Sequence, residues 1–454
     1  MKRLDLEPTA ANILACMDKD IASRNADIKR FISLLDGIEP PFSICIDAPW
    51  GDGKTMFVKS VQMILEARNP NVGSDVGRNA LSWAVDEGSM GTEVSGFLPV
   101  YFNAWMNDML DNPLGSVIAS MAADCEVDCD APRSGMLQKA AAVVDSIGGL
   151  LGHGPNISAA VSEFGGNRLI DEYRNRRKLE EEISDFIDSV LAERAEKLVL
   201  CIDELDRCRP EYAIRLLGDI KNLFENERVI IVYSMDLMQL ANALEGFYGS
   251  SFATRKYLER FYDKRFEMIP VREQNYFNET TVPQYSSGRF DAIVVELLQA
   301  TSGTMRDMNR LKMTIRDAEK YAKRSRVGTD FGVALADAGL LPVFIFLEHE
   351  APEVWRRVRM AQSLEKVYDF GAKSPAFVDF LDSAIRSAYP NIGEVDDDVR
   401  RKYVMDLCCL IFIDENSTDE RRVKAYQDLG HLFWMAMDVD ALRSFDFRRY
   451  KGNQ

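Results

Sequence analysis

The sequence lacks the features of a secreted or membrane-spanning protein. Its first residues, MKRLDLEPTAAN, contain no apolar run of the kind that a signal peptide requires. The best candidate for a membrane span, the uncharged stretch Ser146–Ser162, holds four glycines, a proline, an asparagine and a histidine. A span needs about 20 mainly apolar residues. We therefore expect a cytoplasmic protein without an integral span, and we leave peripheral association with a membrane open.

Histidine is scarce, and the cysteines form no obvious metal site. The 454 residues include three histidines and eight cysteines, and the cysteines are scattered, several of them within apolar runs. This pattern is typical of reduced, buried thiols in a cytosolic protein. Cys125 and Cys129 are close enough in sequence to share a metal, but tetrahedral zinc needs four ligands and a second pair is missing.

Basic residues are outnumbered by acidic ones. Lys and Arg together number 55 and Asp and Glu 72, which gives a net charge of −17. Such a surface repels phosphate backbones, so nucleic acid is a disfavoured partner unless one face is locally basic. Hydrophobic residues make up 46% and charged residues 28%, as in an ordinary globular protein, and the length suits two or three domains.

Strands alternate with helices in the first 270 or so residues. A polar helix is expected over residues 20–35, a short buried strand at Phe42–Asp47 and a helix at Thr55–Ala67. A second strand is expected at Phe97–Trp105, and a long charged helix over residues 169–197 leads into another buried strand. The pattern predicts an α/β fold with a parallel sheet sandwiched by helices, and from about residue 290 the apolar period is helical.

The segment Ala48–Thr55, APWGDGKT, lies between a predicted strand and a predicted helix. A loop that cradles phosphates needs glycines that let its backbone N–H groups turn inward, a lysine that reaches the phosphates and a hydroxyl for Mg²⁺. The usual first glycine is replaced by Ala48, which is acceptable if this position does not need a positive φ. We expect the nucleotide to be bound by Trp50, Gly51, Asp52, Gly53, Lys54, Thr55 and Met56. The alternative is a Gly-rich surface turn.

A second motif supplies carboxylates. Five apolar residues, Leu198–Ile202, precede Asp203 and Glu204. Ligands of open α/β sheets bind at the carboxyl ends of the strands. We expect Asp203, with Thr55, to hold Mg²⁺, and Glu204 to orient or deprotonate a water that attacks the γ-phosphate. An acidic strand end that caps the next helix is the alternative.

Two weaker elements fit the same plan. A further strand ends in Ser234-Met235-Asp236, where a polar side chain could sense the γ-phosphate, although an ordinary helix N-cap at Asp236 explains the residue equally well. Arg306 and Arg310 lie four apart on one predicted helix face and could reach back over the nucleotide, or could belong to a solvated face.

These motifs resemble those of the KAP family of P-loop NTPases. The resemblance covers about residues 20–325 and rests on WGDGKT, on NAW at Asn103–Trp105, on Asp203–Phe224, on Tyr257–Val271 and on Met305–Leu311. It implies ATP as the nucleotide, a core with an additional strand, a helical lid and insertions between the two Walker motifs that often contain membrane helices. This sequence departs from the pattern at Ala48 and in having no usable span in the insertion.

Further roles follow from the resemblance alone. Arg207 is a candidate arginine finger across a subunit boundary, and Arg260 and Arg265 are its rivals, although a structural ion pair would explain any one of them. The resemblance also implies an NTPase core over residues 1–275 and a helical lid over 276–326. Composition predicts two insertions in this core, a polar and Gly-rich loop at about 68–96 and a stretch at about 126–166 whose Gly, Ala and Ser mark an insertion rather than a core element. The helical apolar period predicts a C-terminal helical domain over 327–454.

The sequence therefore predicts a Mg²⁺-dependent ATPase in which ATP binding and hydrolysis drive a conformational change or an assembly. The partner would be another copy of the chain or an effector protein, and the resemblance adds a link to anti-phage defence. The alternatives are a nucleotide-gated scaffold with little hydrolysis, a small-molecule kinase and a DNA-associated motor.

Overall fold

The chain divides into two compact units, Leu6–Pro270 and Val271–Gln454, which are described separately. The computed structural model describes residues 7–20, 23–69, 71, 96–127, 136–150, 167–192, 194–223, 226–249, 251–269, 288–300, 304–325, 331–413 and 417–433. Most of the loop expected at 68–96, residues 151–166 of the expected insertion and the side chains of Cys125 and Cys129 lie outside the described residues.

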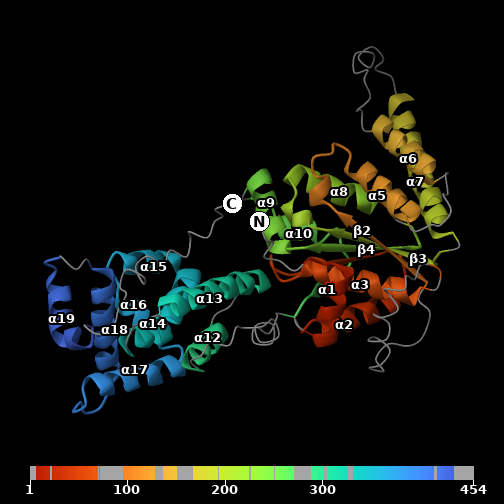
Figure 1. The fold of residues 1–454 in the computed structure, drawn as a ribbon. Coiled ribbons are helices and arrows are strands. Elements are labelled where there is room, and N and C mark those ends of the chain that lie inside the picture. Colours follow the sequence, from red (N-terminus) through yellow and green to blue (C-terminus); the bar gives the residue numbers. More distant parts are fainter. Residues whose placement is uncertain are drawn as a thin grey trace. The chain divides into compact units, whose positions relative to one another are not determined.

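The first unit contains a parallel sheet of five strands (Figure 1). The strands are β1 (Phe42–Asp47), β2 (Phe97–Asn103), β3 (Lys197–Asp203), β4 (Val229–Met235) and β5 (Lys264–Glu267), in the order β2-β3-β4-β1-β5. Strand β4 pairs with both β1 and β3, so it separates the strands that carry the two motifs. The predicted α/β class is confirmed, and β4 is the additional strand that the resemblance implied.

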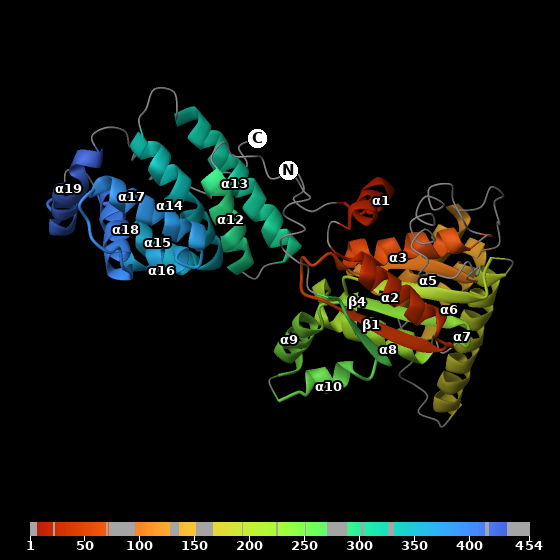
Figure 2. The ribbon, with the colours of Figure 1, turned by 90° about the horizontal axis from the view of Figure 1, so that it is seen from below.

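Helices cover both faces of the sheet, as Figures 1 and 2 show. One face carries α1 (Ala10–Lys19), α2 (Asn25–Asp36) and α3 (Lys54–Arg68). The other carries α5 (Pro113–Val127), α6 (Met136–Leu150), α7 (Asn167–Leu191), α8 (Pro210–Leu223), α9 (Leu237–Tyr248) and α10 (Thr254–Leu258). Because strand side chains alternate between faces, two hydrophobic cores form, one on each side of the sheet.

This alternation determines the face on which the site lies. On β3, Val199 and Cys201 join the core beneath α3, whereas Leu200 and Ile202 join the opposite core. Asp203 continues the first series. Its carboxylate therefore lies on the same face as α3, the helix that begins at the Gly-rich loop.

Several element boundaries differ from expectation. The helix expected over residues 20–35 begins only at Asn25, because Asp20 (φ 46°) and Ser23 (φ 51°) leave the helical region. A further helix, α1, precedes it and is N-capped by Thr9, whose hydroxyl accepts from the Asn12 N–H. The second strand ends at Asn103 rather than Trp105, and the long helix ends at Leu191, so that Lys197 already belongs to β3.

Part of the expected insertion at 126–166 belongs to the hydrophobic core, contrary to the expectation that this stretch is not a core element. Helix α6 buries Ala140, Val143 and Ile147 against the helices on its face of the sheet. The composition, rich in Gly, Ala and Ser, indicated an insertion outside the core, but these three side chains recur at helical spacing.

All regular secondary structure in the described residues of the second unit is helical. It consists of α12 (Gly288–Ala300), α13 (Met305–Ser325), α14 (Phe331–Glu350), α15 (Pro352–Arg359), α16 (Glu365–Gly371), α17 (Pro375–Ala388), α18 (Asp397–Phe412) and α19 (Glu420–Phe433). Leu297 of α12 and Leu311 of α13 share one hydrophobic core with the later helices, so the structure groups the expected lid region with the helices that follow it. Within the described parts of the chain, no helix is long and apolar enough to cross a membrane.

Candidate nucleotide-binding site

The loop between β1 and α3 has the backbone conformation that its glycines allow. Gly51 (φ 94°) and Gly53 (φ 79°) both lie in the left-handed region, where a side chain would be strained. Ala48 is buried and does not adopt a positive φ. The loop therefore forms without the usual first glycine.

Lys54 is folded back over this loop. Its Nζ donates to the carbonyl oxygen of Ala48 at 2.7 Å and to that of Pro49 at 3.3 Å. Helix α3 begins at Lys54, so its first N–H groups have no acceptor within the helix and its N-terminus carries partial positive charge. An ammonium group and a helix N-terminus at one Gly-rich turn make a site suited to an anion such as a phosphate.

The two motifs meet at Thr55 and Asp203. The Thr55 hydroxyl donates to Oδ2 of Asp203 at 2.7 Å, and the Tyr101 hydroxyl donates to the same oxygen at 3.0 Å. Oδ1 of Asp203 accepts from the Glu204 N–H at 2.9 Å, and the carboxylate is fully buried. A hydroxyl beside a carboxylate is the oxygen donor set that Mg²⁺ prefers, so these residues fit the ion.

Glu204 adopts a left-handed backbone conformation (φ 61°, ψ 28°), which is uncommon for a residue with a side chain. Its Oε1 pairs with Arg207 at 3.0 Å, and its Oε2 accepts from the Asn103 amide at 3.3 Å. Burial raises the pKa of Glu204, and the neighbouring Asp203 raises it further, whereas Arg207 and Asn103 oppose this shift. The result is a carboxylate held beside Asp203 with increased basicity.

Arg207 interacts with its own chain. Besides the ion pair with Glu204, its guanidinium lies over the Trp105 ring, 5.3 Å from the ring centre. Its action as a finger across a subunit boundary stays a prediction.

Trp50 connects the Gly-rich loop to the segments that follow β3 and β4. Its indole N–H donates to Oδ2 of Asp206, and its backbone N–H donates to Oδ2 of Asp236 at 3.2 Å. Burial raises the pKa of Asp206, opposed by Lys54 and by the Trp50 hydrogen bond. Asp236 also N-caps α9 by accepting from the Gln239 N–H at 3.0 Å. The N-cap explanation of Asp236 is thus confirmed, and a contact with nucleotide stays a prediction.

Comparison with family models supports the assignment of the two motifs to a P-loop domain. A model described as the KAP family P-loop domain matches residues 24–321. The chain belongs to the KAP family of P-loop NTPases. A search of curated proteins gave no match. Among solved structures, the Orc1 protein of Aeropyrum pernix in complex with DNA matches at 13% identity and a TM-score of 0.32, covering 94% of this chain and 93% of that one.

In this KAP chain, Arg24 is a site residue that the sequence did not indicate. Its guanidinium donates to Oδ2 of Asp27 at 3.2 Å, to the carbonyl of Asp52 at 3.0 Å and to the carbonyl of Ile269. It thereby joins α2, the Gly-rich loop and the segment after β5. Two of these partners are distant in sequence, so no local pattern marks the residue. Tyr101 and Asn103 were identifiable in principle, because both are polar residues near the carboxyl end of a strand.

The other candidate arginines of the KAP domain differ from Arg207 in their surroundings. Arg265 pairs with Asp47 at 2.6 Å and with Glu267 at 3.0 Å, which agrees with a structural ion pair at the sheet edge. The Arg260 side chain is exposed. Arg306 and Arg310 lie on α13 in the second unit, where Arg310 pairs with Asp307 at 3.7 Å. Contact of either residue with nucleotide stays a prediction.

Two further expected residues also lie in the KAP core. The Ser234 hydroxyl is fully buried and has no hydrogen-bond partner among the described residues, and Ser234 is paired in register with Asp203. Met56 follows Thr55 in the first turn of α3 and is half-buried against the core beneath that helix. Both therefore lie within the neighbourhood of the two motifs.

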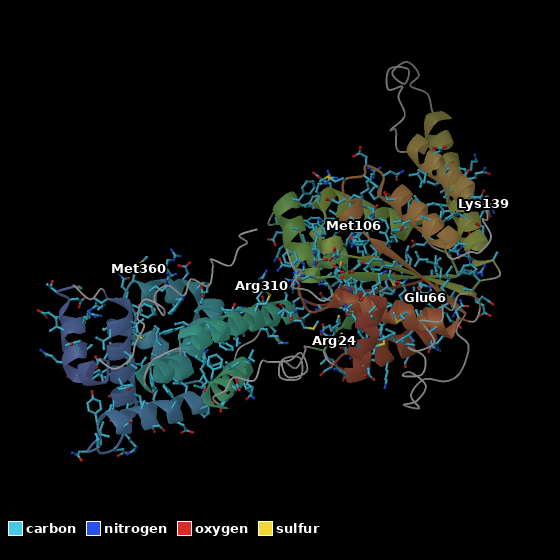
Figure 3. All side chains as sticks on the ribbon, in the orientation of Figure 1. Arg24, Glu66, Met106, Lys139, Arg310 and Met360 are labelled. Carbon is cyan, nitrogen blue, oxygen red and sulfur yellow. The ribbon has the colours of Figure 1, made fainter. Side chains whose placement is uncertain are left out.

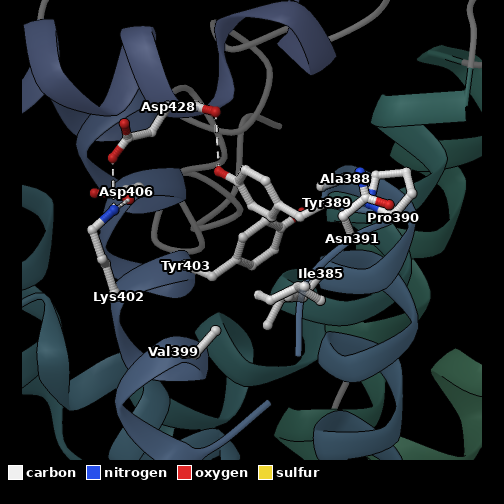
Figure 4. A pocket seen from close by; sticks show the side chains of 11 residues that line it. Ile385, Ala388, Tyr389, Pro390, Asn391, Val399, Lys402, Tyr403, Asp406 and Asp428 are labelled. Carbon is white, nitrogen blue, oxygen red and sulfur yellow. Dashed lines mark hydrogen bonds and ion pairs between the residues drawn. The ribbon is translucent and has the colours of Figure 1, made fainter. Parts of the chain in front are cut away.

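A separate pocket lies in the helical unit (Figure 4). Tyr389, Tyr403 and aliphatic side chains line it, and Lys402 lies at one side between Asp406 (3.0 Å) and Asp428 (2.6 Å). The Tyr389 hydroxyl donates to the Asp428 carbonyl at 3.0 Å. Because two carboxylates neutralise Lys402, this pocket does not offer a phosphate the surroundings that the Gly-rich loop does.

Proposed function

We propose that this KAP protein is a Mg²⁺-dependent ATPase. The observation that carries the proposal is the 2.7 Å hydrogen bond between Thr55 and Asp203, with Glu204 as the next residue. It brings together an anion-binding loop, an oxygen donor pair suited to Mg²⁺ and a carboxylate of increased basicity. Binding of a nucleoside triphosphate needs the first two features, and its hydrolysis needs all three.

The loop and its lysine would bind the phosphates. In this proposal the backbone N–H groups from Gly51 to Thr55 donate to phosphate oxygens, and the Lys54 ammonium leaves the carbonyls of Ala48 and Pro49 to do the same. Trp50, Asp52 and Met56 complete the walls of the site. Thr55 and Asp203 would hold Mg²⁺, which neutralises phosphate charge when bound.

Glu204 would act on water. Its carboxylate orients the attacking water and accepts its proton, and Arg207 fixes one carboxylate oxygen through the ion pair. Asp236 and Arg306 are proposed to sense the nucleotide, the first from the end of β4 and the second from α13.

ATP turnover would drive a structural change rather than transfer phosphate to an acceptor. The helical second unit offers surface for a partner, and we propose that ATP binding and hydrolysis change the conformation of the chain or its association with a second copy or an effector protein. On the family resemblance alone, we propose that this change serves anti-phage defence. The defence role is tested by comparing phage resistance of strains that carry the wild type and the Lys54→Ala variant, and we expect the variant strain to lose resistance.

Phosphate release from ATP tests the enzymatic proposal. The wild type is assayed with Mg²⁺, with a chelator, and with or without duplex DNA, in the absence of any added acceptor. We expect release that depends on Mg²⁺ and that DNA does not change. Tight ATP binding without release would contradict hydrolysis and favour a nucleotide-gated scaffold. Release only with an added acceptor would indicate a kinase, and salt-sensitive stimulation by DNA would indicate a motor.

A further inference from the structure

We propose that Asn103 is a positioning residue for Glu204, and that it ties the Glu204 carboxylate to an exposed apolar loop. The proposal rests on the proposed ATPase function, because it assigns Asn103 a part in the step that Glu204 performs.

Strand pairing places Asn103 beside Glu204. Asn103 is the last residue of β2 and is paired in register with Asp203, and the next N–H, of Ala104, donates to the Asp203 carbonyl at 2.9 Å. The Asn103 Nδ2 lies 3.3 Å from Oε2 of Glu204, while Arg207 holds Oε1 from the other side. The two carboxylate oxygens are therefore held by two different residues, which limits rotation of the carboxylate.

The loop after β2 fixes the orientation of the Asn103 amide. Its Oδ1 accepts from the Met106 N–H at 2.9 Å. Because a backbone N–H can only donate, Oδ1 must face Met106, and the NH₂ group must face the carboxylate. The backbone carbonyl of Asn103 also accepts from the Asn107 side chain at 2.9 Å. The loop thus presents a hydrogen-bond donor to Glu204.

The loop after β2, residues 104–112, exposes four large apolar side chains. Trp105 and Leu110 are each 51% exposed, Met106 (labelled in Figure 3) is 80% exposed and Met109 is 85% exposed. Trp105 also lies against Arg207, the other partner of Glu204. Both groups that hold the Glu204 carboxylate are consequently in contact with residues of this loop, so a displacement of the loop would change the position of the carboxylate.

Substitutions of Asn103 distinguish a role in positioning Glu204 from a purely structural role in the loop. Asn103→Asp keeps an acceptor for the Met106 N–H but replaces the donor that faces Glu204 by a carboxylate, whereas Asn103→Ala removes both. Met109→Ala is the control in the same loop, since Met109 is 85% exposed and its side chain takes part in neither of the hydrogen bonds that hold Asn103. Protection of the Met106 amide from hydrogen exchange reports whether the loop is intact, and kcat and KM for Mg-ATP are measured for each variant.

We expect kcat to fall by about 10- to 100-fold in both Asn103 variants, with KM unchanged. In Asn103→Asp the fall would occur although Met106 stays protected, and Met109→Ala would keep kcat near that of the wild type. A kcat for Asn103→Asp equal to that of the wild type would show that Asn103 only caps the loop and would overturn the inference. A wild type that binds ATP and releases no phosphate overturns the proposed function instead, and with it this inference.

Discussion

The Thr55 hydroxyl donates a 2.7 Å hydrogen bond to Oδ2 of Asp203, although 148 positions separate the two residues. Thr55 lies in the first turn of α3, and Asp203 ends β3, so the contact requires that β4 be inserted between β1 and β3 in the correct register. This contact is the clearest sign that the two sequence motifs form one site.

Asp203→Asn tests the metal role of this pair. The amide keeps an acceptor for Thr55 and Tyr101 but loses the negative charge and the acceptor of the Glu204 N–H, so Mg²⁺ should be held less tightly, at some cost in stability. We expect the Mg²⁺ concentration needed for half-maximal phosphate release to rise and the maximal rate to fall on the order of 100-fold. Titration of Mg²⁺ at fixed ATP measures both, with Tyr101→Phe as a control of unchanged charge. An unaltered Mg²⁺ requirement would remove Asp203 from the metal site.

Gly53→Ala and Ala48→Gly test the backbone of the phosphate loop. Gly53 needs a left-handed φ of 79°, which costs an L-residue about 1 to 2 kcal/mol, so Gly53→Ala should weaken ATP binding about tenfold. Ala48 does not use that region, so Ala48→Gly should leave ATP affinity unchanged and lower the stability by about 0.5 to 1 kcal/mol. Calorimetric titration with Mg-ATP compares them. Stronger ATP binding by Ala48→Gly would mean that the missing glycine impairs the site.

Arg24→Ala should destabilise the first unit. Its guanidinium is buried and satisfies Asp27, and its removal would leave that fully buried carboxylate with one partner fewer, at a cost of about 3 kcal/mol. Lys178→Ala removes an exposed helical ion pair with Glu182 and should cost less than about 0.5 kcal/mol. Denaturant unfolding of both variants measures the difference. Equal losses would contradict the role of Arg24 as a buried tie between α2 and the loop.

The sequence predicted the parts of the site whose chemistry is local. Gly51 to Thr55 are contiguous, and Asp203 and Glu204 directly follow an apolar strand, so spacing alone identified them. Arg24 could not be found in this way, because two of its partners, Asp52 and Ile269, come near it only in the folded chain. Helix α6 was missed because its many small residues lower the apolar contrast on which periodicity depends.

Lys312 should make stability depend on pH above neutrality. Burial lowers the pKa of Lys312 to about 8, below the value of about 10.4 in the unfolded chain. Between these values the unfolded chain binds more protons, so the free energy of unfolding should rise with pH from about 8 to about 10. Lys312→Met should remove this rise and stabilise the protein at pH 7, whereas the exposed Lys424→Met should retain the rise. Urea unfolding at several pH values measures the slopes, and identical slopes for wild type and Lys312→Met would refute the assignment.

The most direct test of the account compares wild type, Lys54→Ala and Glu204→Gln for ATP affinity and phosphate release, with particle mass recorded in each nucleotide state. Lys54 hydrogen-bonds within the phosphate loop, whereas Glu204 is held by Asn103 and Arg207 outside that loop, so the two substitutions should have different effects. We expect Lys54→Ala to lose ATP binding, and Glu204→Gln to bind ATP, release no phosphate and accumulate the ATP-bound conformation or assembly. Phosphate release by Glu204→Gln at the wild-type rate would contradict the account.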